Sequence, residues 1–541
     1  MQAQSLRLQN QTLGALPLVD HYLRTLRLRA LLAEQVRHGP YADGLELLVK
    51  SLLVRPNALY RIEAWARQYD PALRPAAHLG DDALGRALDR LFDSDRASLM
   101  TALVVQASKT FDLATDQIHN DTTSIKFCGA YAHQDPRAAQ LRRGFSKDHR
   151  PDLKQLIYCL SVSADGAVPV HFKTYDGNQS DDGTHLETWQ CLRRLLGRAD
   201  FLYVADGKLC AGPTLLQLDQ QGGRFITVLP RNRVEAVSFA QEAAASRVRW
   251  QPLGSRPASR KPGRRDSFDA AAGLQQMREG FRVYWYRSSE KRRFDAQERQ
   301  NRIAAALERL DRLNERRGRG PKTEPAVRRA ADNVLARFRL QGLIRFQIDL
   351  RQEEQFVQTT RGKATAQTTY KRRTRTIPTL RAQLDAAAVD AAQTMDGVFP
   401  LVTNTDLPAW QVLQKYKYQP RLEKRHFLGK SVLEISPVFL KKNSRIEALM
   451  FLCFVAQMVA ALMERTLRKN MARRKIKAIP ILPEGRDSKT PSYAQILDTF
   501  ALQTKHYLYE NDHLIQTFID PLADLQTSVL DLLEIAPAVY Q

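Results

Sequence analysis

Three acidic residues of this 541-residue sequence occupy positions from which carboxylates commonly do chemistry. Asp121 lies within a β-rich run, residues 118–127, and Asp206 directly follows a short apolar run. A carboxylate that ends a strand emerges at the strand's carboxyl edge, where open α/β sheets place ligands and catalytic groups. Glu423 lies in residues 410–432, which we expect to be helical.

Two carboxylates on neighbouring strands and a third on a packed helix can hold two divalent metal ions roughly 3.5–4 Å apart. Mg²⁺ suits such a set because it prefers oxygen ligands and keeps several waters, and Mn²⁺ can replace it. One ion would polarise an attacking water or 3′-hydroxyl, and the other would stabilise the leaving oxygen. The alternative is structural, since an Asp at a strand end is often a turn former or a helix cap. The 58 acidic residues also allow many such triplets by chance.

The elements that must position these carboxylates follow an α/β pattern. From about residue 113 the sequence predicts three strands, then a helix, a strand, a second helix and a further strand, with the strands at 118–127, 156–162, 168–175, 201–205 and 225–229. This order predicts a mixed sheet flanked by helices. Residues 1 to about 110 are predicted to be helical. Such a helical module is either a DNA-recognition unit or a packing or dimerisation domain.

The charge of the chain is concentrated in one zone. The whole sequence carries 82 Lys and Arg against 58 Asp and Glu, a net charge of +24. Residues 231–380 alone hold 35 basic and 16 acidic residues, which is +19 of that excess. A run of basic residues is usually a solvated face, but this concentration favours a surface that follows phosphates. Double-stranded DNA is therefore the first candidate partner.

Membrane insertion and secretion are not expected. The longest apolar stretch, residues 448–463, covers 16 residues and includes Gln457, whereas a membrane span needs roughly 20. No apolar segment of the kind found in a secretory signal follows Met1. The five cysteines show no paired spacing, which argues against a disulfide framework or a zinc ribbon. These features predict a cytoplasmic protein, associated with the nucleoid when bound to DNA.

The residues around Glu423 resemble a known signature. Tyr418, Arg421, Glu423 and Lys430 are similar to the Tyr-Arg-Glu-Lys signature of the insertion-sequence-four superfamily of DDE transposases. Further short blocks that resemble those of the family's long members follow in the expected order, at residues 119–124, 144–152, 177–181, 204–207, 403–405 and 437–440. Together they touch most of the chain from about 115 to 490.

The resemblance implies an RNase H-like core in which Asp121, Asp206 and Glu423 are the catalytic, metal-binding triad. It also implies a domain inserted ahead of the helix that carries Glu423, which accounts for the long gap between the second and third acids. We therefore predict four regions: a helical N-terminal domain (1–112), the first part of the catalytic core (113–232), a basic inserted domain (233–395), and the second part of the core with C-terminal helices (396–541).

One part of the signature departs from the family pattern. In the family the Arg precedes the Glu by four positions and shares its helix face, whereas Arg421 precedes Glu423 by only two. Either Arg421 or Arg425 would supply the phosphate-binding charge, and Lys430 returns to the face of Glu423. Tyr418 would bind phosphate or pack. We expect His119 and His426 to be structural or solvated, because two-metal chemistry needs no histidine base.

The resemblance implies a DNA transposase of a bacterial insertion sequence. It would cleave strands at the terminal inverted repeats and join them to target DNA, with Mg²⁺, as a homodimer or a higher synaptic complex. One alternative is an RNase H-like DNA nuclease without strand transfer. The other is a catalytically inactive DNA-binding protein derived from a transposase.

Overall fold

The computed structural model describes residues 6–75, 80–144, 150–179, 183–258, 263–273, 275–315, 323–429 and 440–541. The chain divides into two compact units. The first comprises Met1–Thr227, Thr403–Thr405 and Leu413–Gln541, and the second comprises Val228–Val402 and Asp406–Val412. Along the sequence, the second unit therefore interrupts the first.

The first unit contains a mixed sheet with the strand order β4-β3-β2-β5-β6. Its strands are β2 (Gln117–Phe127), β3 (Lys154–Ser163), β4 (Pro169–Asp176), β5 (Leu202–Val204) and β6 (Arg224–Val228). The first three strands form an antiparallel meander, whereas β5 runs parallel to β2 and β6 runs parallel to β5. Helices α7 (Thr184–Leu196) and α8 (Gly212–Gln220) connect the last strands. This is the mixed α/β sheet that the sequence predicted.

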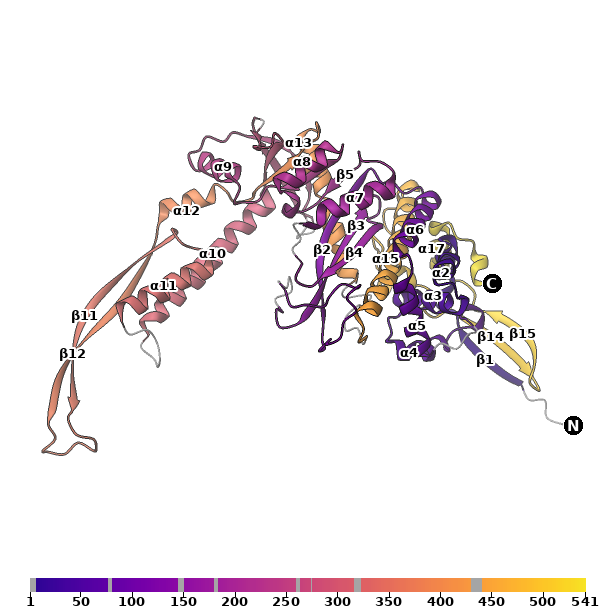
Figure 1. The fold of residues 1–541 in the computed structure, drawn as a ribbon, viewed down its shortest axis with the longest axis horizontal. Helices are drawn as coiled ribbons and strands as arrows, with labels where there is room; N and C mark the ends of the chain where they lie inside the picture. Colours follow the sequence, from indigo (N-terminus) through magenta and orange to yellow (C-terminus); the bar gives the residue numbers. More distant parts are fainter. Residues whose placement is uncertain are drawn as a thin grey trace. The chain divides into compact units, whose positions relative to one another are not determined.

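One long apolar helix forms the centre of the first unit. Helix α15 (Asn443–Arg473) packs against β4 and against helices α3, α5 and α17 (Figure 1). Its Ala, Leu and Met residues have high helix propensity, and residues on every face of the helix are buried. By length and composition an 18-residue window of α15 is able to cross a membrane, but 89% of that window is buried inside the protein. It is thus packed as a core helix.

The N-terminal part of the first unit contains six α-helices between Leu16 and Phe111 within the described residues. Its helices are α1 (Leu16–Thr25), α2 (Leu28–Val36), α3 (Gly39–Val54), α4 (Leu59–Ala66), α5 (Asp81–Asp93) and α6 (Arg96–Phe111). Arg445 of α15 joins α5 through a bidentate pair with Asp89, at 2.6 and 2.8 Å. The N-terminal helices and the long core helix thus share one packed body.

Both ends of the chain contradict the all-helical expectation. Strand β1 (Leu6–Thr12) pairs with β14 (Thr504–Glu510), which forms a hairpin with β15 (His513–Ile519). Figure 1 shows these terminal segments side by side. Asn511 and Asp512 both have positive φ, as a two-residue hairpin turn requires. Helices α16 (Tyr493–Asp498) and α17 (Asp524–Leu533) flank the hairpin in sequence.

The segment expected to be helical, residues 410–432, contains two helices. The structure has α13 (Ala409–Tyr416) and α14 (Gln419–Phe427), separated by a turn at Lys417 and Tyr418. Pro420 has no backbone N–H to donate to the preceding turn, but it fits the first turn of a new helix. The break therefore begins the helix that carries Glu423.

The second unit combines a small antiparallel sheet with a long two-stranded ribbon. The sheet has the order β13-β10-β8-β7, with β9 against β10. Its strands are β7 (Trp250–Pro257), β8 (Arg265–Ala271), β9 (Gln275–Gln276), β10 (Arg282–Ser288) and β13 (Val398–Thr403). The ribbon pairs β11 (Ile344–Gln358) with β12 (Tyr370–Leu384). The helices are α9 (Val234–Ala244), α10 (Ser289–Asp311), α11 (Glu324–Phe338) and α12 (Ala386–Gln393).

Candidate functional site

Asp121 and Asp206 lie at the same level of the first unit's sheet. In the parallel pair of β2 and β5, His119 is opposite Val204, and each acid follows two residues later in its own segment. Adjacent strands are about 4.8 Å apart, so this register places the two acids as neighbours across the sheet. Asp206 also caps a short 3₁₀ turn, because its Oδ1 accepts the backbone N–H of Lys208 at 3.0 Å. It is both a helix cap and a carboxylate at the strand end.

Glu423 is brought to β2 by the helix on which it lies. At the start of α14, Gln419 accepts a hydrogen bond from His119 Nδ1 at 2.7 Å and donates one to the carbonyl oxygen of Asn120 at 3.1 Å. Glu423 follows Gln419 by four residues and therefore lies on the same side of the helix. Its side chain is exposed. The helix is thus fastened next to the strand that carries Asp121.

Tyr416, the last residue of α13, has a pKa that all three acids influence. Burial, and after it the negative charges of Asp206, Glu423 and Asp121, raise the pKa of Tyr416 to about 12. One phenol therefore lies within the electrostatic reach of the whole predicted triad. The hydroxyl stays protonated and neutral near pH 7. Sequence reasoning missed Tyr416, although it lies only two positions before Tyr418 of the signature.

Each of the two aspartates has a buried histidine beside it. His185 Nε2 lies 3.6 Å from Asp206 Oδ1, and its Nδ1 lies 3.2 Å from the Tyr203 hydroxyl. His426 Nε2 lies 3.8 Å from Asp121 Oδ2. These contacts to the aspartates are longer than hydrogen bonds. His185, at the start of α7, was not singled out in the sequence because nothing local marks it.

His119 is a structural residue, as expected. Burial lowers the pKa of His119 to about 4, so the imidazole is neutral near pH 7. Its Nδ1–H donates to Gln419, and its Nε2 lies 2.7 Å from Gln117 Nε2, an amide donor. Nδ1 therefore holds α14 to β2, Nε2 is occupied within β2, and neither nitrogen is available as a general base.

Arg425, Arg421 and Tyr418, which belong to the predicted phosphate-binding residues, lie in different environments. Arg425 is buried, pairs with Glu464 of α15 at 2.9 Å, and donates to the carbonyl oxygens of Gly166 and Ala167 at 3.0 Å each. Either Arg421 or Arg425 was predicted to bind phosphate, and in this arrangement the Arg425 guanidinium is enclosed among protein partners. Arg425 instead ties α14 to α15 and to the turn between β3 and β4.

Arg421 and Tyr418 form a small stack at the start of α14. The Arg421 guanidinium lies 4.8 Å from the centre of the Tyr418 ring, and the Tyr418 ring lies 5.1 Å from that of His119. Arg421 is exposed, whereas Tyr418 is half-buried. Burial raises the pKa of Tyr418, and the charge of Arg421 opposes that shift. Tyr418 therefore packs, and the guanidinium of Arg421 lies over its ring while the Arg421 side chain is exposed to solvent.

The donor chemistry of the triad fits a hard divalent cation, since it consists of three carboxylates. However, no group of three or more His, Cys, Asp and Glu side chains is close enough to hold a metal ion within the described part of the chain. Asp121 Oδ1 accepts the backbone N–H of Thr122 at 2.8 Å in this arrangement. Lys430, residues 145–149 and residues 437–439, which belong to the predicted motifs, lie outside the described residues.

No family model matches the chain, and no curated protein matches it. Among solved structures the chain is similar to piggyBac transposase in a synaptic complex with hairpin DNA. The sequence identity is 8% and the TM-score is 0.39, with 95% of this chain and 82% of that chain covered. A TM-score this low does not establish a shared fold.

Proposed function

We propose that the chain is a DNA transposase of a bacterial insertion sequence, which cleaves strands at terminal inverted repeats and transfers them to target DNA. The observation that carries the proposal is the register that sets Asp121 and Asp206 on neighbouring parallel segments, with Glu423 on a helix hydrogen-bonded to β2. The net charge of +24 supports a polyanionic substrate.

Asp121, Asp206 and Glu423 would hold Mg²⁺, or Mn²⁺ in its place. When bound, these ions supply charge stabilisation for the attacking and leaving oxygens of an in-line phosphoryl transfer. Arg421 would bind a phosphate oxygen of the DNA, a role supported by its exposure and by its position over the Tyr418 ring. Tyr416 donates a hydrogen bond from its protonated hydroxyl to one of the carboxylates or to the bound phosphate.

The transposase would act as a homodimer in the cytoplasm, since two DNA ends must be held together. The outer strand β15 supports such an assembly. It contains no Asp, Glu, Lys, Arg or Pro, and it exposes Leu514, Ile515 and Phe518 by 42–52%. Edge strands without charges or prolines readily pair with another strand.

A strand-transfer assay tests the proposed function. The full-length protein is incubated with labelled duplexes that carry the ends of its element, a target plasmid and Mg²⁺. Joined products are expected. Cleavage without joining would replace the proposal by the nuclease, and binding without cleavage would replace it by the inactive DNA-binding relative.

A further inference from the structure

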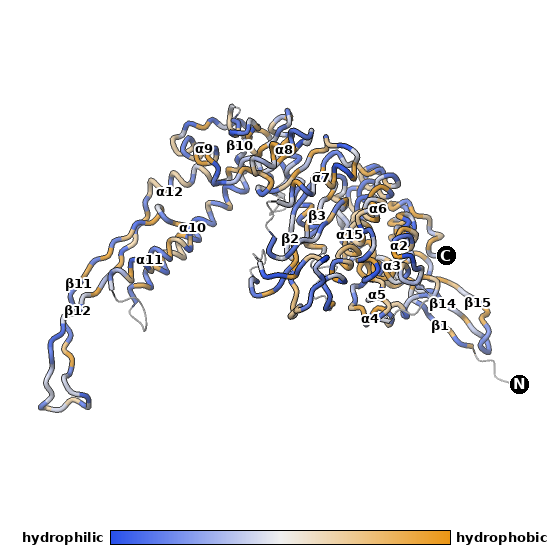
Figure 2. The backbone as a smooth tube through the Cα atoms, in the orientation of Figure 1, coloured by the Kyte–Doolittle hydropathy of each residue, from blue (hydrophilic) through white to orange (hydrophobic). Residues whose placement is uncertain are grey.

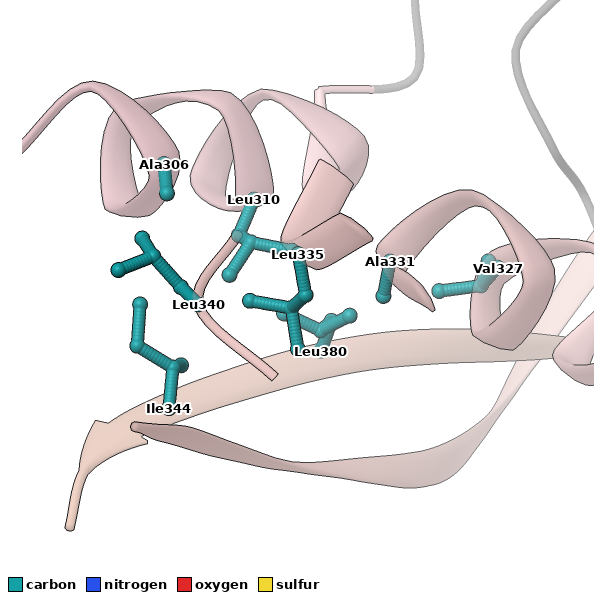
Figure 3. Close-up of a cluster of buried hydrophobic side chains, with 8 residues drawn as sticks. All are labelled: Ala306, Leu310, Val327, Ala331, Leu335, Leu340, Ile344 and Leu380. Atoms are coloured by element: carbon teal, nitrogen blue, oxygen red, sulfur yellow. The ribbon is translucent and has the colours of Figure 1, made fainter. Parts of the chain in front are cut away.

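The β11–β12 ribbon of the second unit has a firmly packed base. Ile344 of β11 and Leu380 of β12 belong to a buried cluster with residues of α10, α11 and the segment that follows α11, namely Ala306, Leu310, Val327, Ala331, Leu335 and Leu340 (Figure 3). Asn314 adds two hydrogen bonds to the backbone of Leu380, at 2.8 and 2.9 Å. The base of the ribbon is therefore held rigidly by two helices.

Beyond this base the ribbon is exposed to solvent. Each strand has 15 residues, so the ribbon is about 50 Å long at roughly 3.4 Å per residue. Residues 349–356 of β11 and 370–376 of β12 are all exposed. The ribbon continues past the helices as two paired strands of mixed hydropathy (Figure 2). An isolated hairpin is marginally stable, which suggests that a partner covers this half.

The two faces of the ribbon differ sharply in charge. The register pairs Arg351 with Ile377, Glu353 with Arg375, Gln355 with Arg373 and Val357 with Lys371, and it has no shift. Because side chains alternate between faces, the odd-numbered residues share one face. That face carries six cations and two anions, a net charge of +4: Arg345, Arg351, Lys371, Arg373, Arg375 and Arg381 against Asp349 and Glu353. We call it the cationic face.

The even-numbered face is electrically neutral. Its charged residues are Arg372 and Glu354, which pair with each other at 3.3 Å. The apolar residues Leu350, Phe356 and Tyr370 lie on this face and are 54%, 65% and 53% exposed. The uncompensated charge is therefore confined to one side of the ribbon.

We propose that the β11–β12 ribbon is a DNA-binding arm whose cationic face lies along the phosphate backbone of duplex DNA. Lys371, Arg373 and Arg375 follow one another at a step of about 6.7 Å, which equals the rise of about two base pairs along the duplex axis. A two-stranded ribbon also fits the width of the major groove. The inference rests on the proposed function, in that it assumes DNA as the substrate.

The test measures DNA binding by the full-length protein as a function of salt. The variant combines Arg351→Gln, Lys371→Gln, Arg373→Gln and Arg375→Gln, and affinity for a labelled 30-bp duplex is measured by fluorescence anisotropy between 50 and 300 mM NaCl. If each cation neutralises one phosphate, the plot of log K against log[salt], where K is the association constant, becomes less steep by between about 3 and 4 in slope. Affinity at 150 mM NaCl falls by roughly 10²–10³-fold.

Two control variants use the same ribbon. Arg351→Lys, Arg373→Lys and Arg375→Lys together keep the charge and are expected to keep the salt slope. Phe356→Ser with Tyr370→Ser changes the neutral face and is expected to leave DNA binding unchanged. Because all six substituted positions are exposed or nearly so, the thermal unfolding midpoint should be the same in every variant.

The outcomes separate the arm from the proposed function. A wild-type salt slope in the four-Gln variant, with steep salt dependence in the wild type, overturns the arm and leaves the transposase untouched. An altered oligomeric state of the Phe356→Ser, Tyr370→Ser variant, with normal DNA binding by the four-Gln variant, would assign the ribbon to a protein partner and also overturn the arm. Wild-type protein that fails to bind DNA would remove the proposed function together with the arm.

Discussion

Arg425 gives a direct test of what the tertiary structure adds to the signature motif. The structure places it in a buried ion pair with Glu464, with both side chains less than 10% exposed, and with two carbonyl oxygens as further acceptors. Removing one partner of a buried pair costs about 3–5 kcal/mol, because the other charge stays buried. Glu464 keeps weaker contacts to Arg468 at 3.4 Å and to the Tyr493 N–H at 3.1 Å, so we expect about 3 kcal/mol for Arg425→Met.

This loss of stability converts into a measurable shift in melting. The first unit has about 360 residues, and the unfolding entropy is roughly 2.1 cal/mol/K per residue. A loss of about 3 kcal/mol then lowers the unfolding midpoint of that unit by roughly 4 °C. The midpoint is measured by differential scanning fluorimetry, and DNA affinity is measured separately at 20 °C, where the variant is folded.

Arg421→Met is the matched control, since Arg421 lies one helical turn earlier and is exposed. It should keep the wild-type midpoint and lose about one phosphate contact, which lowers the salt slope by roughly 0.9. The double variant Arg425→Met, Glu464→Gln should recover part of the lost stability, because it leaves no buried charge unpaired. A wild-type midpoint in Arg425→Met, with DNA affinity reduced as far as in Arg421→Met, would refute the structural role.

Three further expectations concern the triad, Tyr416 and pH. Asp121→Asn, Asp206→Asn or Glu423→Gln should abolish strand cleavage in the gel assay while end binding stays within about twofold, and wild-type cleavage by any one variant would remove that residue from the triad. Tyr416→Phe should slow cleavage about tenfold, since a hydrogen bond to a charged group is lost, and an unchanged rate would contradict its placement among the acids. Burial lowers the pKa of His171 to about 4, compared with 6.5 in the unfolded chain. Above pH 6.5 the imidazole is neutral in both states and its stabilising contribution is complete. As the pH falls from 6.5 towards 4, only the unfolded chain takes up the proton, so the free energy of unfolding falls by roughly 3 kcal/mol. In His171→Leu the urea midpoint of unfolding should therefore decrease less between pH 6.5 and 4 than in the wild type. An equal decrease of the midpoint in both proteins would count against this account.

The core strands could be predicted because their signals are local. The segments that form β2, β3 and β4 are continuous β-rich runs bounded by turns. Such a pattern can be recognised without knowing which distant residues the strands contact. The pairing of β1 with β14 could not be predicted in the same way. It joins Leu6 to Glu510, and neither segment indicates its partner by its own pattern. The start of α14 also has a local signal, because Pro420 cannot continue a preceding helix but fits the first turn of a new one.

The sequence by itself determined the chemical types available at the candidate site and their order along the chain, together with a concentration of positive charge in residues 231–380. Only the tertiary structure decided which of these side chains reach solvent. Arg421 and Arg425 are one helical turn apart and chemically identical, yet one is exposed and the other is enclosed by Glu464 and two carbonyl oxygens. The difference arises because burial and electrostatic neighbours come from α15 and the turn between β3 and β4, which are remote in sequence and meet α14 only when the chain folds.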